Sequence, residues 1–213
     1  METILELRGV DAGYDRHLVL RGVHFTLREG DFVGVIGPNG GGKTTLLKVI
    51  LGLLPPRAGE VIYRFPARSL FGYLPQNSRF DARFPISVEE VVLSGLLSEK
   101  GIYKRYTRAD RARAREMLEA YGMASCRDRA IGELSGGQVQ RVFLCRALVS
   151  SPRVLILDEP ATYVDNRFEQ AFYSLLGELN RRMSIVMVSH DLATVRALAK
   201  SVISVSEGQC KKE

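Results

Sequence analysis

The sequence predicts an α/β fold with a mostly parallel sheet, an N-terminal antiparallel β part and an inserted helical part. A glycine-rich loop stands between an apolar run, Phe32 to Ile36, and a stretch with helical spacing. The last third of the chain alternates strand and helix patterns, which is typical of parallel βαβ units. Residues 78–135 carry helix signals without a strong strand pattern, so we expect a helical insertion there.

The composition is that of one folded domain. The chain has 213 residues, of which 46% are hydrophobic and 25% charged, and its net charge is +6. Three scattered cysteines argue against a disulfide framework and favour a reducing compartment. The start of the chain lacks the pattern of a signal peptide, and no apolar stretch is long enough to span a membrane. We therefore expect an intracellular protein that works at a membrane only through a partner.

The first elements follow from local patterns. Apolar and polar residues alternate over residues 23–28, which predicts a strand, and residues 29–31 read as a turn before the buried strand at 32–36. Thr44 to Leu53 has helical spacing, and Pro55-Pro56 ends that helix. Two further strands are expected at Val61–Tyr63 and Phe71–Leu74.

The patterns of the insertion and of the C-terminal part predict further helices and strands. Ser87 opens a capping-box pattern that predicts a helix to about Leu97, and Thr107 begins a second helix that reaches Tyr121. The elements expected after the insertion are a helix at 138–150, a strand at 153–157, a helix at 166–182, a strand at 184–188, a helix at 191–199 and a strand at 201–205.

The second helix carries a cluster of arginines. Such a cluster could attract nucleic acid or anionic lipid, but no aromatic residues alternate with the arginines to stack on bases. We favour a solvated helix face on which Asp110 and Glu116 serve as partners. The cluster consists of Arg105, Arg108, Arg111, Arg113 and Arg115.

The glycine-rich loop, Gly37 to Thr44, matches the phosphate-loop pattern G-x-x-x-x-G-K-[ST] in the required strand–loop–helix context. Its backbone N–H groups and the helix N-terminus would form an anion cradle. Lys43 would reach the β and γ phosphates, and the Thr44 hydroxyl would bind Mg²⁺. The alternative is a glycine-rich turn with a chance Lys-Thr. The expected cradle comprises Gly37, Asn39, Gly40, Gly41, Gly42, Lys43, Thr44 and Thr45.

Two carboxylates end a later apolar strand. Asp158 stands at the carboxyl end of the strand, where ligands of α/β sheets gather, and could hold Mg²⁺. Glu159 is the candidate for polarising an attacking water molecule. The alternative is a strand that leaves the core with two solvated acids.

A second glycine pair, in Leu134-Ser-Gly-Gly-Gln138, precedes an apolar helix. Ser135 followed by Gly136 and Gly137 is another anion-binding arrangement at a helix start. The alternative is an ordinary N-cap, which would need only Ser135. Since glycine lowers helix stability, close approach of a ligand explains the pair better.

Leu134-Ser-Gly-Gly-Gln138, placed between the phosphate loop and the acidic strand, resembles the signature of ATP-binding cassette ATPases. Four further residues match the family's motifs. By resemblance, Tyr14 stacks on adenine, Gln76 senses Mg²⁺ and the γ-phosphate, Asp165 lies in the loop after the acidic strand, and His190 contacts the γ-phosphate. Without the resemblance, Tyr14 would more often be a packing aromatic, Gln76 a loop residue and His190 a structural histidine. His17 and His24 lack spacing partners for a metal site and are read as structural.

The resemblance implies a P-loop NTPase fold and an ATPase that uses ATP and Mg²⁺. Residues 1–77 and 136–213 would form the catalytic core, and 78–135 a helical signature subdomain. Two chains would pack head to tail, so that the signature of one closes over ATP held by the other. The implied catalytic residues are Glu159, His190, Lys43 and Gln76; the implied Mg²⁺ ligands are Thr44, Gln76 and Asp158; Gln138 joins the nucleotide contacts.

The resemblance also implies partners. The chain is most similar to the ATPase subunits of importers of zinc, manganese or related ions, which sit on the inner face of the cell membrane beneath a permease. Residues 77–90 correspond to the part that receives a permease helix, and a solute-binding protein would complete the complex. A non-transport cassette with a division-type membrane partner remains an alternative, and no nucleic-acid partner is expected. Gly41 and Tyr163 depart from the family pattern, the first where Ala or Ser is commoner.

Overall fold

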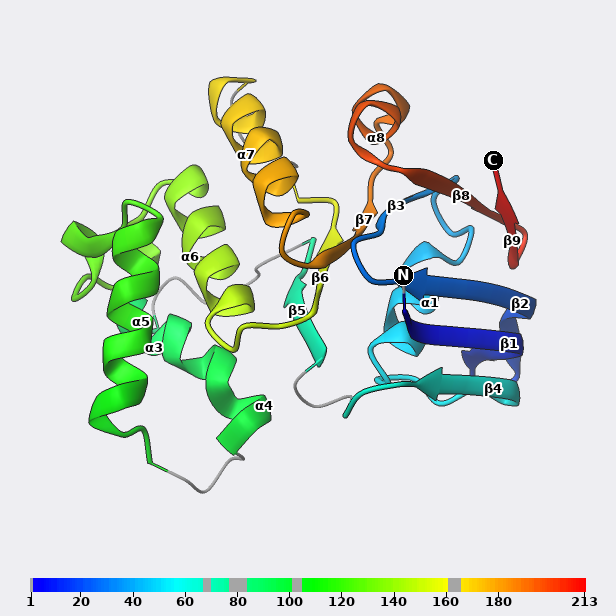
Figure 1. Cartoon of the computed structure of the whole chain (residues 1–213), viewed down its shortest axis with the longest axis horizontal. Coiled ribbons are helices and arrows are strands. Elements are labelled where there is room, and N and C mark those ends of the chain that lie inside the picture. Colours follow the sequence, from blue (N-terminus) through cyan, green and yellow to red (C-terminus); the bar gives the residue numbers. More distant parts are fainter. Residues whose placement is uncertain (1, 67–69, 77–83, 101–104, 161–165) are drawn as a thin grey trace.

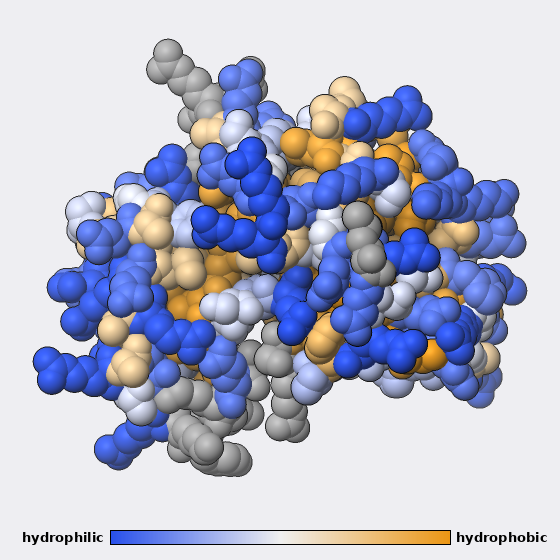
Figure 2. All heavy atoms as spheres, in the orientation of Figure 1, coloured by the Kyte–Doolittle hydropathy of each residue, from blue (hydrophilic) through white to orange (hydrophobic). Residues whose placement is uncertain are grey.

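The computed structural model describes residues 2–66, 70–76, 84–100, 105–160 and 166–213. Figure 1 shows two lobes, one built around the sheets and one made of helices. Figure 2 shows a largely hydrophilic surface with apolar side chains visible between the charged ones. Within the described residues, no helix combines the length and the apolar composition that a transmembrane span requires.

A three-stranded antiparallel sheet forms the N-terminal part, in the order β2-β1-β4. Strand β1 spans Thr3–Tyr14, β2 spans His17–Arg28 and β4 spans Ala58–Tyr63. The alternation seen in the sequence places Val23, Phe25 and Leu27 in the core. The predicted antiparallel part is thus confirmed, and its last strand begins three residues earlier than the sequence indicated.

The main sheet has six strands in the order β5-β6-β7-β3-β8-β9. The first five run parallel, as expected, and three of them are buried along their whole length. The last strand, β9 (Gln209–Lys212), pairs antiparallel with β8 and was not foreseen from its polar sequence. The parallel strands are β3 (Phe32–Ile36), β5 (Phe71–Leu74), β6 (Val154–Asp158), β7 (Ser184–Val188) and β8 (Ser201–Ser206).

Helices cover both faces of the main sheet. Helix α1 (Lys43–Ile50) lies between the two sheets and shares one core with their inner faces. Helices α6 (Gly136–Leu148), α7 (Asn166–Leu179) and α8 (Leu192–Leu198) pack in a second core on the opposite face. The phosphate-loop helix and the signature helix therefore belong to different sides of the sheet.

Several helix ends differ from the sequence prediction for identifiable reasons. Helix α1 stops before Leu53 because Gly52 adopts a φ of 70° and Leu53 N–H bonds back to the Lys48 carbonyl. Helix α6 begins two residues earlier than predicted because Ser135 caps it and the glycines are tolerated in its first turn. Helix α7 ends before Asn180, whose N–H still bonds to the Leu176 carbonyl and whose side-chain amide donates to the carbonyls of Gly30 and Asp31.

The helical insertion has its own apolar core, to which α6 also contributes. The capping box predicted at Ser87 is present, and Thr107, predicted as the start of the second helix, also forms a capping box. The first predicted helix is divided into α3 (Val88–Leu93), a 3₁₀ turn at Ser94–Leu96 and α4 (Leu97–Lys100). It is followed by α5 (Arg108–Ala120) and by 3₁₀ turns at Ala124–Cys126 and Ile131–Glu133.

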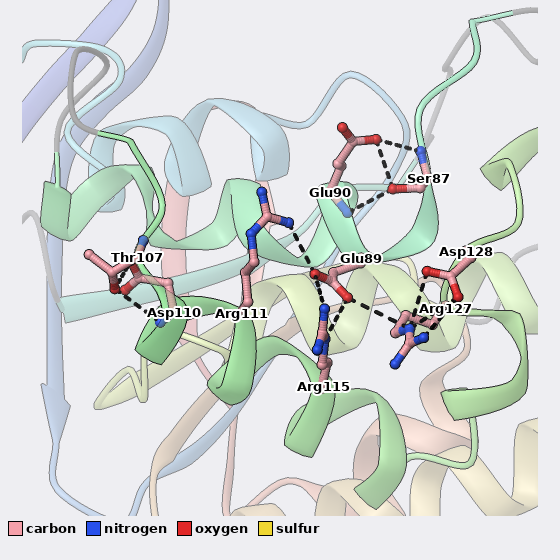
Figure 3. A network of polar contacts seen from close by, with 9 residues as sticks. All are labelled: Ser87, Glu89, Glu90, Thr107, Asp110, Arg111, Arg115, Arg127 and Asp128. Atoms are coloured by element: carbon pink, nitrogen blue, oxygen red, sulfur yellow. Dashed lines mark hydrogen bonds and ion pairs between the residues drawn. The ribbon is translucent and has the colours of Figure 1, made fainter.

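Four of the five arginines of the cluster lie on α5, Arg105 precedes it, and three of the four bind carboxylates that the sequence did not indicate. Arg111 and Arg115 bind Glu89 on α3, and Arg113 binds Glu99 (Figure 3 shows the first two). Asp110 forms the capping box with Thr107 and so satisfies an N–H group at the helix start. Its role as an arginine partner stays a prediction.

Candidate active site

The phosphate loop has the geometry of an anion cradle. Its last glycine, Gly42, is the N-cap of α1, no side chain caps the helix, and no acidic residue lies in its first turn. The helix N-terminus therefore keeps its free N–H groups and positive potential. The Lys43 ammonium, nearly buried, donates to the carbonyls of Gly37 at 2.7 Å and Pro38 at 3.0 Å. Thr44 is exposed, whereas Thr45 is buried.

Strand β8 restricts the side chains that the loop tolerates. A Cβ atom at Gly37 would lie 2.0 Å from the Val205 carbonyl oxygen, and φ at Gly37 is 145°. A Cβ atom at Gly41 would lie 2.7 Å from the same oxygen, so an alanine there would require a shift. The departure from the family pattern at Gly41 thus has a local packing reason.

Three predicted catalytic residues lie together around Glu159. The Gln76 amide nitrogen Nε2 donates to Glu159 Oε2 at 2.5 Å, and His190 Nδ1 is 3.6 Å from the same oxygen. Gln76, Glu159 and His190 follow β5, β6 and β7, which are neighbours in the parallel sheet. Because the carboxyl ends of parallel strands meet at one edge, the topology brings these side chains together.

The surroundings of Glu159 suit a residue that orients a water molecule. Its side chain is 12% exposed, whereas that of His190 is 68% exposed. The Glu159 backbone has a φ of 48°, and its N–H donates to the Val188 carbonyl at 2.9 Å. A non-glycine residue in this left-handed region is uncommon and often accompanies a functional site.

Asp158 is 4% exposed, which identifies it as a buried carboxylate beside the phosphate loop. Burial, followed by the charge of Glu159, raises the pKa of Asp158, while Tyr73 and Lys43 oppose the rise. Burial and Asp158 raise the pKa of Tyr73 to about 12, so its hydroxyl remains a donor. The sequence analysis missed Tyr73, although its position three residues before Gln76 on a predicted strand was a usable signal.

The expected Mg²⁺ ligands form a chemically suitable set. Mg²⁺ prefers oxygen donors and usually takes one or two carboxylates together with phosphate oxygens. Asp158 offers a carboxylate, Thr44 a hydroxyl and Gln76 an amide oxygen. These residue types fit Mg²⁺ bound with a nucleotide, although in the described residues no cluster of three His, Cys, Asp or Glu side chains could hold a metal alone.

The signature residues lie apart from the phosphate loop, at the start of α6 in the helical lobe (Figure 1). Ser135 Oγ accepts from the Gln138 N–H at 3.4 Å, and Gln138 Oε1 accepts from the Ser135 N–H at 3.0 Å. Ser135 is therefore an N-cap, and Gly136 beside it is exposed. Gln140 on the same helix donates to the carbonyl of Pro160, directly after Glu159, a contact that the sequence did not reveal.

Tyr14 ends β1 with its ring 40% exposed. The Lys48 ammonium, on α1, lies 5.1 Å from the centroid of this ring. Lys48 thereby connects Tyr14 to the phosphate-loop helix. The sequence did not indicate this contact. Asp165 and Tyr163 lie outside the described residues.

The comparisons with known proteins identify the family. Residues 20–162 match the ABC transporter family, and the chain belongs to that family as an ATPase domain.

Three curated relatives carry names that refer to metal transport. The chain is 43% identical to the zinc uptake system ATP-binding protein ZurA of Listeria innocua, over 97% of the chain and 84% of the relative. It is 44% identical to the zinc transport system ATP-binding protein TroB of Treponema pallidum, over 92% and 77%. It is 41% identical to the manganese transport system ATP-binding protein MntB of Bacillus subtilis, over 89% and 78%.

Solved structures confirm the fold. The chain superposes with a TM-score of 0.88 and 27% identity on a transporter described as of the metal-chelate type in an inward-facing conformation, covering 100% of this chain and 83% of that one. It superposes with a TM-score of 0.82 and 27% identity on a dimeric ATP-binding cassette, MJ0796, in a post-hydrolysis state with ADP and Pi, covering 99% and 98%.

Proposed function

We propose that the chain is the ATP-hydrolysing subunit of an ABC importer whose cargo is zinc or manganese. The observation that carries the ATPase part is the convergence of Gln76 and His190 on Glu159 at the strand edge beside the phosphate loop. The names of the relatives support the cargo. The cargo is a substrate of the whole complex, and no residue of this subunit needs to contact it.

In the proposed mechanism, the phosphate-loop backbone and Lys43 hold the β and γ phosphates. Thr44, Gln76 and Asp158 would hold Mg²⁺, which would supply charge neutralisation at the phosphates. Glu159 accepts a hydrogen bond from the attacking water and orients it towards the γ-phosphorus, aided by the Gln76 amide, which fixes the carboxylate. His190 donates to a γ-phosphate oxygen as charge accumulates there, and Tyr14 stacks on adenine.

The site is proposed to be completed by a second copy of the chain. The helix start at Ser135, with Gly136, Gly137 and Gln138, belongs to the helical lobe, apart from the phosphate loop of its own chain (Figure 1), and would meet the γ-phosphate held by the partner. In this arrangement residues 1–77 and 136–213 act as the catalytic core and 78–135 as the signature subdomain. Two-fold symmetry would then produce two composite sites.

A groove between the two lobes is the proposed site for a permease helix. Its volume is about 420 Å³, and it lies where β5, the end of α1 and the insertion meet. Leu53 and Leu97 project beside it, with 67% and 40% exposure. Exposed apolar side chains next to a groove are typical of an interaction site. We therefore place the chain beneath a permease at the cytoplasmic face, with a solute-binding protein completing the importer.

The proposal is tested by reconstituting the chain with the permease encoded beside its gene into vesicles. Uptake of zinc or manganese that depends on ATP, and that Glu159→Gln abolishes, would support it. Co-purification with a division-type membrane protein, without metal uptake, would overturn the importer assignment and leave the ATPase assignment intact.

A further inference from the structure

The helical insertion contains a buried carboxylate that the proposed reaction does not use. The Glu89 side chain is 8% exposed and faces three guanidinium groups (Figure 3). Arg115 Nε lies 2.9 Å from Oε2, Arg111 Nη1 lies 3.1 Å from Oε1, and Arg127 Nε lies 3.8 Å from Oε2. The hydrogen bond from Arg115 is the main cause that lowers the pKa of Glu89, so the carboxylate is ionised at neutral pH.

The three arginines come from two different parts of the chain. Arg111 and Arg115 belong to α5, whereas Arg127 opens the segment 127–134 that leads to the signature. Arg127 also binds Asp128 at 2.9 Å, so the network holds two carboxylates against three cations. Glu89 therefore joins α3, α5 and the segment before Ser135 at one point.

The backbone makes the same connection. The N–H groups of Val88 and Glu89, which start α3 and lack partners within the helix, donate to the carbonyls of Arg129 and Arg127, each at 3.0 Å. Ile131 N–H donates to the Ile86 carbonyl at 3.0 Å, and Ser87 forms a β-bridge with Ala130. The segment is thus fixed to the start of α3 by both backbone and side chain.

The connection extends to the signature. Arg129 Nη2 donates to the Glu133 carbonyl at 2.8 Å, and residues 131–133 form a 3₁₀ turn that ends directly before Leu134 and Ser135. At the other side, Gln138 Nε2 lies 3.9 Å from Cys126 Sγ, one residue before Arg127. The orientation of the Ser135 N–H and hydroxyl therefore depends on where segment 127–134 is held.

We propose that Glu89 is a positioning residue for the ATPase reaction: through segment 127–134 it fixes Ser135 in the orientation that meets ATP on the partner chain. This inference rests on the proposed two-chain site. Glu89 lies in the insertion, away from the phosphate loop of its own chain, so its loss should spare ATP binding by the monomer. The loss should weaken the closure of two chains over ATP and lower turnover.

The test measures nucleotide-dependent dimerisation by light scattering in a Glu159→Gln background, where turnover is blocked. Adding Glu89→Gln should raise the ATP concentration needed for half-maximal dimer about tenfold, which is about 1.4 kcal/mol. Fluorescent ATP binding by the monomer should not change. Arg127→Gln, which removes the guanidinium on the segment itself, should act in the same direction.

Glu99→Gln is the matched control, because it removes an ion pair with Arg113 on the same helix without touching segment 127–134. It should leave dimerisation unchanged. If Glu89→Gln leaves the ATP concentration for half-maximal dimer unchanged, the inference about Glu89 is refuted and the two-chain site is not. The inference is also refuted if ATP binding by the monomer weakens as much as dimerisation, since that result indicates general destabilisation. Failure of the Glu159→Gln protein itself to dimerise would instead refute the proposed two-chain site.

Discussion

The Gln76 amide donates a 2.5 Å hydrogen bond to the Glu159 carboxylate across a sequence separation of 83 residues. The bond joins the second residue after β5 to the first residue after β6, two adjacent strands. Gln76 immediately precedes the segment that we expect to meet the permease. Residues 77–83 of that segment lie outside the described part of the chain. If a permease shifts Gln76, the hydrogen bond would pass the shift on to the Glu159 carboxylate.

Replacement of the carboxylate should separate binding from chemistry. Glu159→Gln keeps the shape of the side chain but cannot accept a proton from water, so kcat should fall by about 10²- to 10⁴-fold. ATP affinity should be retained, and ATP should now hold two chains together. Steady-state hydrolysis and size-exclusion chromatography with ATP measure both effects. Normal turnover in this variant would exclude the role assigned to Glu159.

Removal of the amide donor should weaken the same step less severely. Gln76→Ala releases the Glu159 carboxylate from its hydrogen-bond donor and removes one proposed Mg²⁺ ligand, so activity should fall about 10- to 100-fold. Gln76→Glu keeps the length but places a second carboxylate 2.5 Å from Glu159, and like charges should make it no better than alanine. Activity is measured against Mg²⁺ concentration; a Gln76→Glu enzyme with native kinetics would contradict this account.

The phosphate loop should not tolerate a side chain at Gly37. Gly37→Ala places a Cβ atom 2.0 Å from the Val205 carbonyl and should lower the free energy of unfolding by about 1–3 kcal/mol. Gly40→Ala is the control, since nothing lies within 4 Å of its added Cβ and only the backbone strain at φ 77° remains. Urea denaturation of the nucleotide-free proteins compares the two. Equal losses would show that contact with β8 is not the cause.

The ring of Tyr14, rather than its hydroxyl, should support nucleotide binding. Tyr14→Phe should keep ATP affinity, because stacking requires only the aromatic face. Tyr14→Ala should weaken binding by about 1–3 kcal/mol, the usual contribution of a base stacked on an aromatic side chain. Fluorescence titration with ATP decides between them, and a strong loss in the phenylalanine variant would refute adenine stacking.

The Glu89 network should make stability depend on pH in one direction. The pKa of Glu89 is below its ordinary value of 4.5, so the folded state binds fewer protons there than the unfolded state. Its stabilisation is therefore complete above about pH 4.5 and decreases as pH falls through the lowered pKa. Glu89→Gln should cost about 2 kcal/mol at pH 7 and less below pH 4. Urea denaturation across pH measures this; a constant difference would contradict it.

Much of the active site was readable from local sequence, because each part is a short motif with its own backbone requirement. The phosphate loop and the strand that ends at the carboxylates 158 and 159 were each assigned correctly as local structures. The N-cap at Ser135, which the sequence analysis gave only as the alternative, is present. The capping box at Ser87 and the helix start at Thr107 were foreseen for the same reason. The catalytic roles and the division into two subdomains stay predictions.

Elements that are stabilised by residues far away in the sequence could not be predicted from local patterns. Strand β9 is exposed except at Cys210, which packs against the first core, and it pairs with β8 through the turn at Glu207 and Gly208. The arginine pattern of α5 showed charge but could not show that Glu89, 22 residues before Arg111, is its partner.

The sequence by itself therefore indicated which residues could bind a polyphosphate. Glycine conformation, helix caps and strand ends each depend on only a few neighbouring residues. The tertiary structure alone decided that Gln76, Glu159 and His190 meet, and that Glu89 fixes the segment before Ser135. These contacts depend on strand order and helix packing, which arise from burying apolar faces across the whole chain.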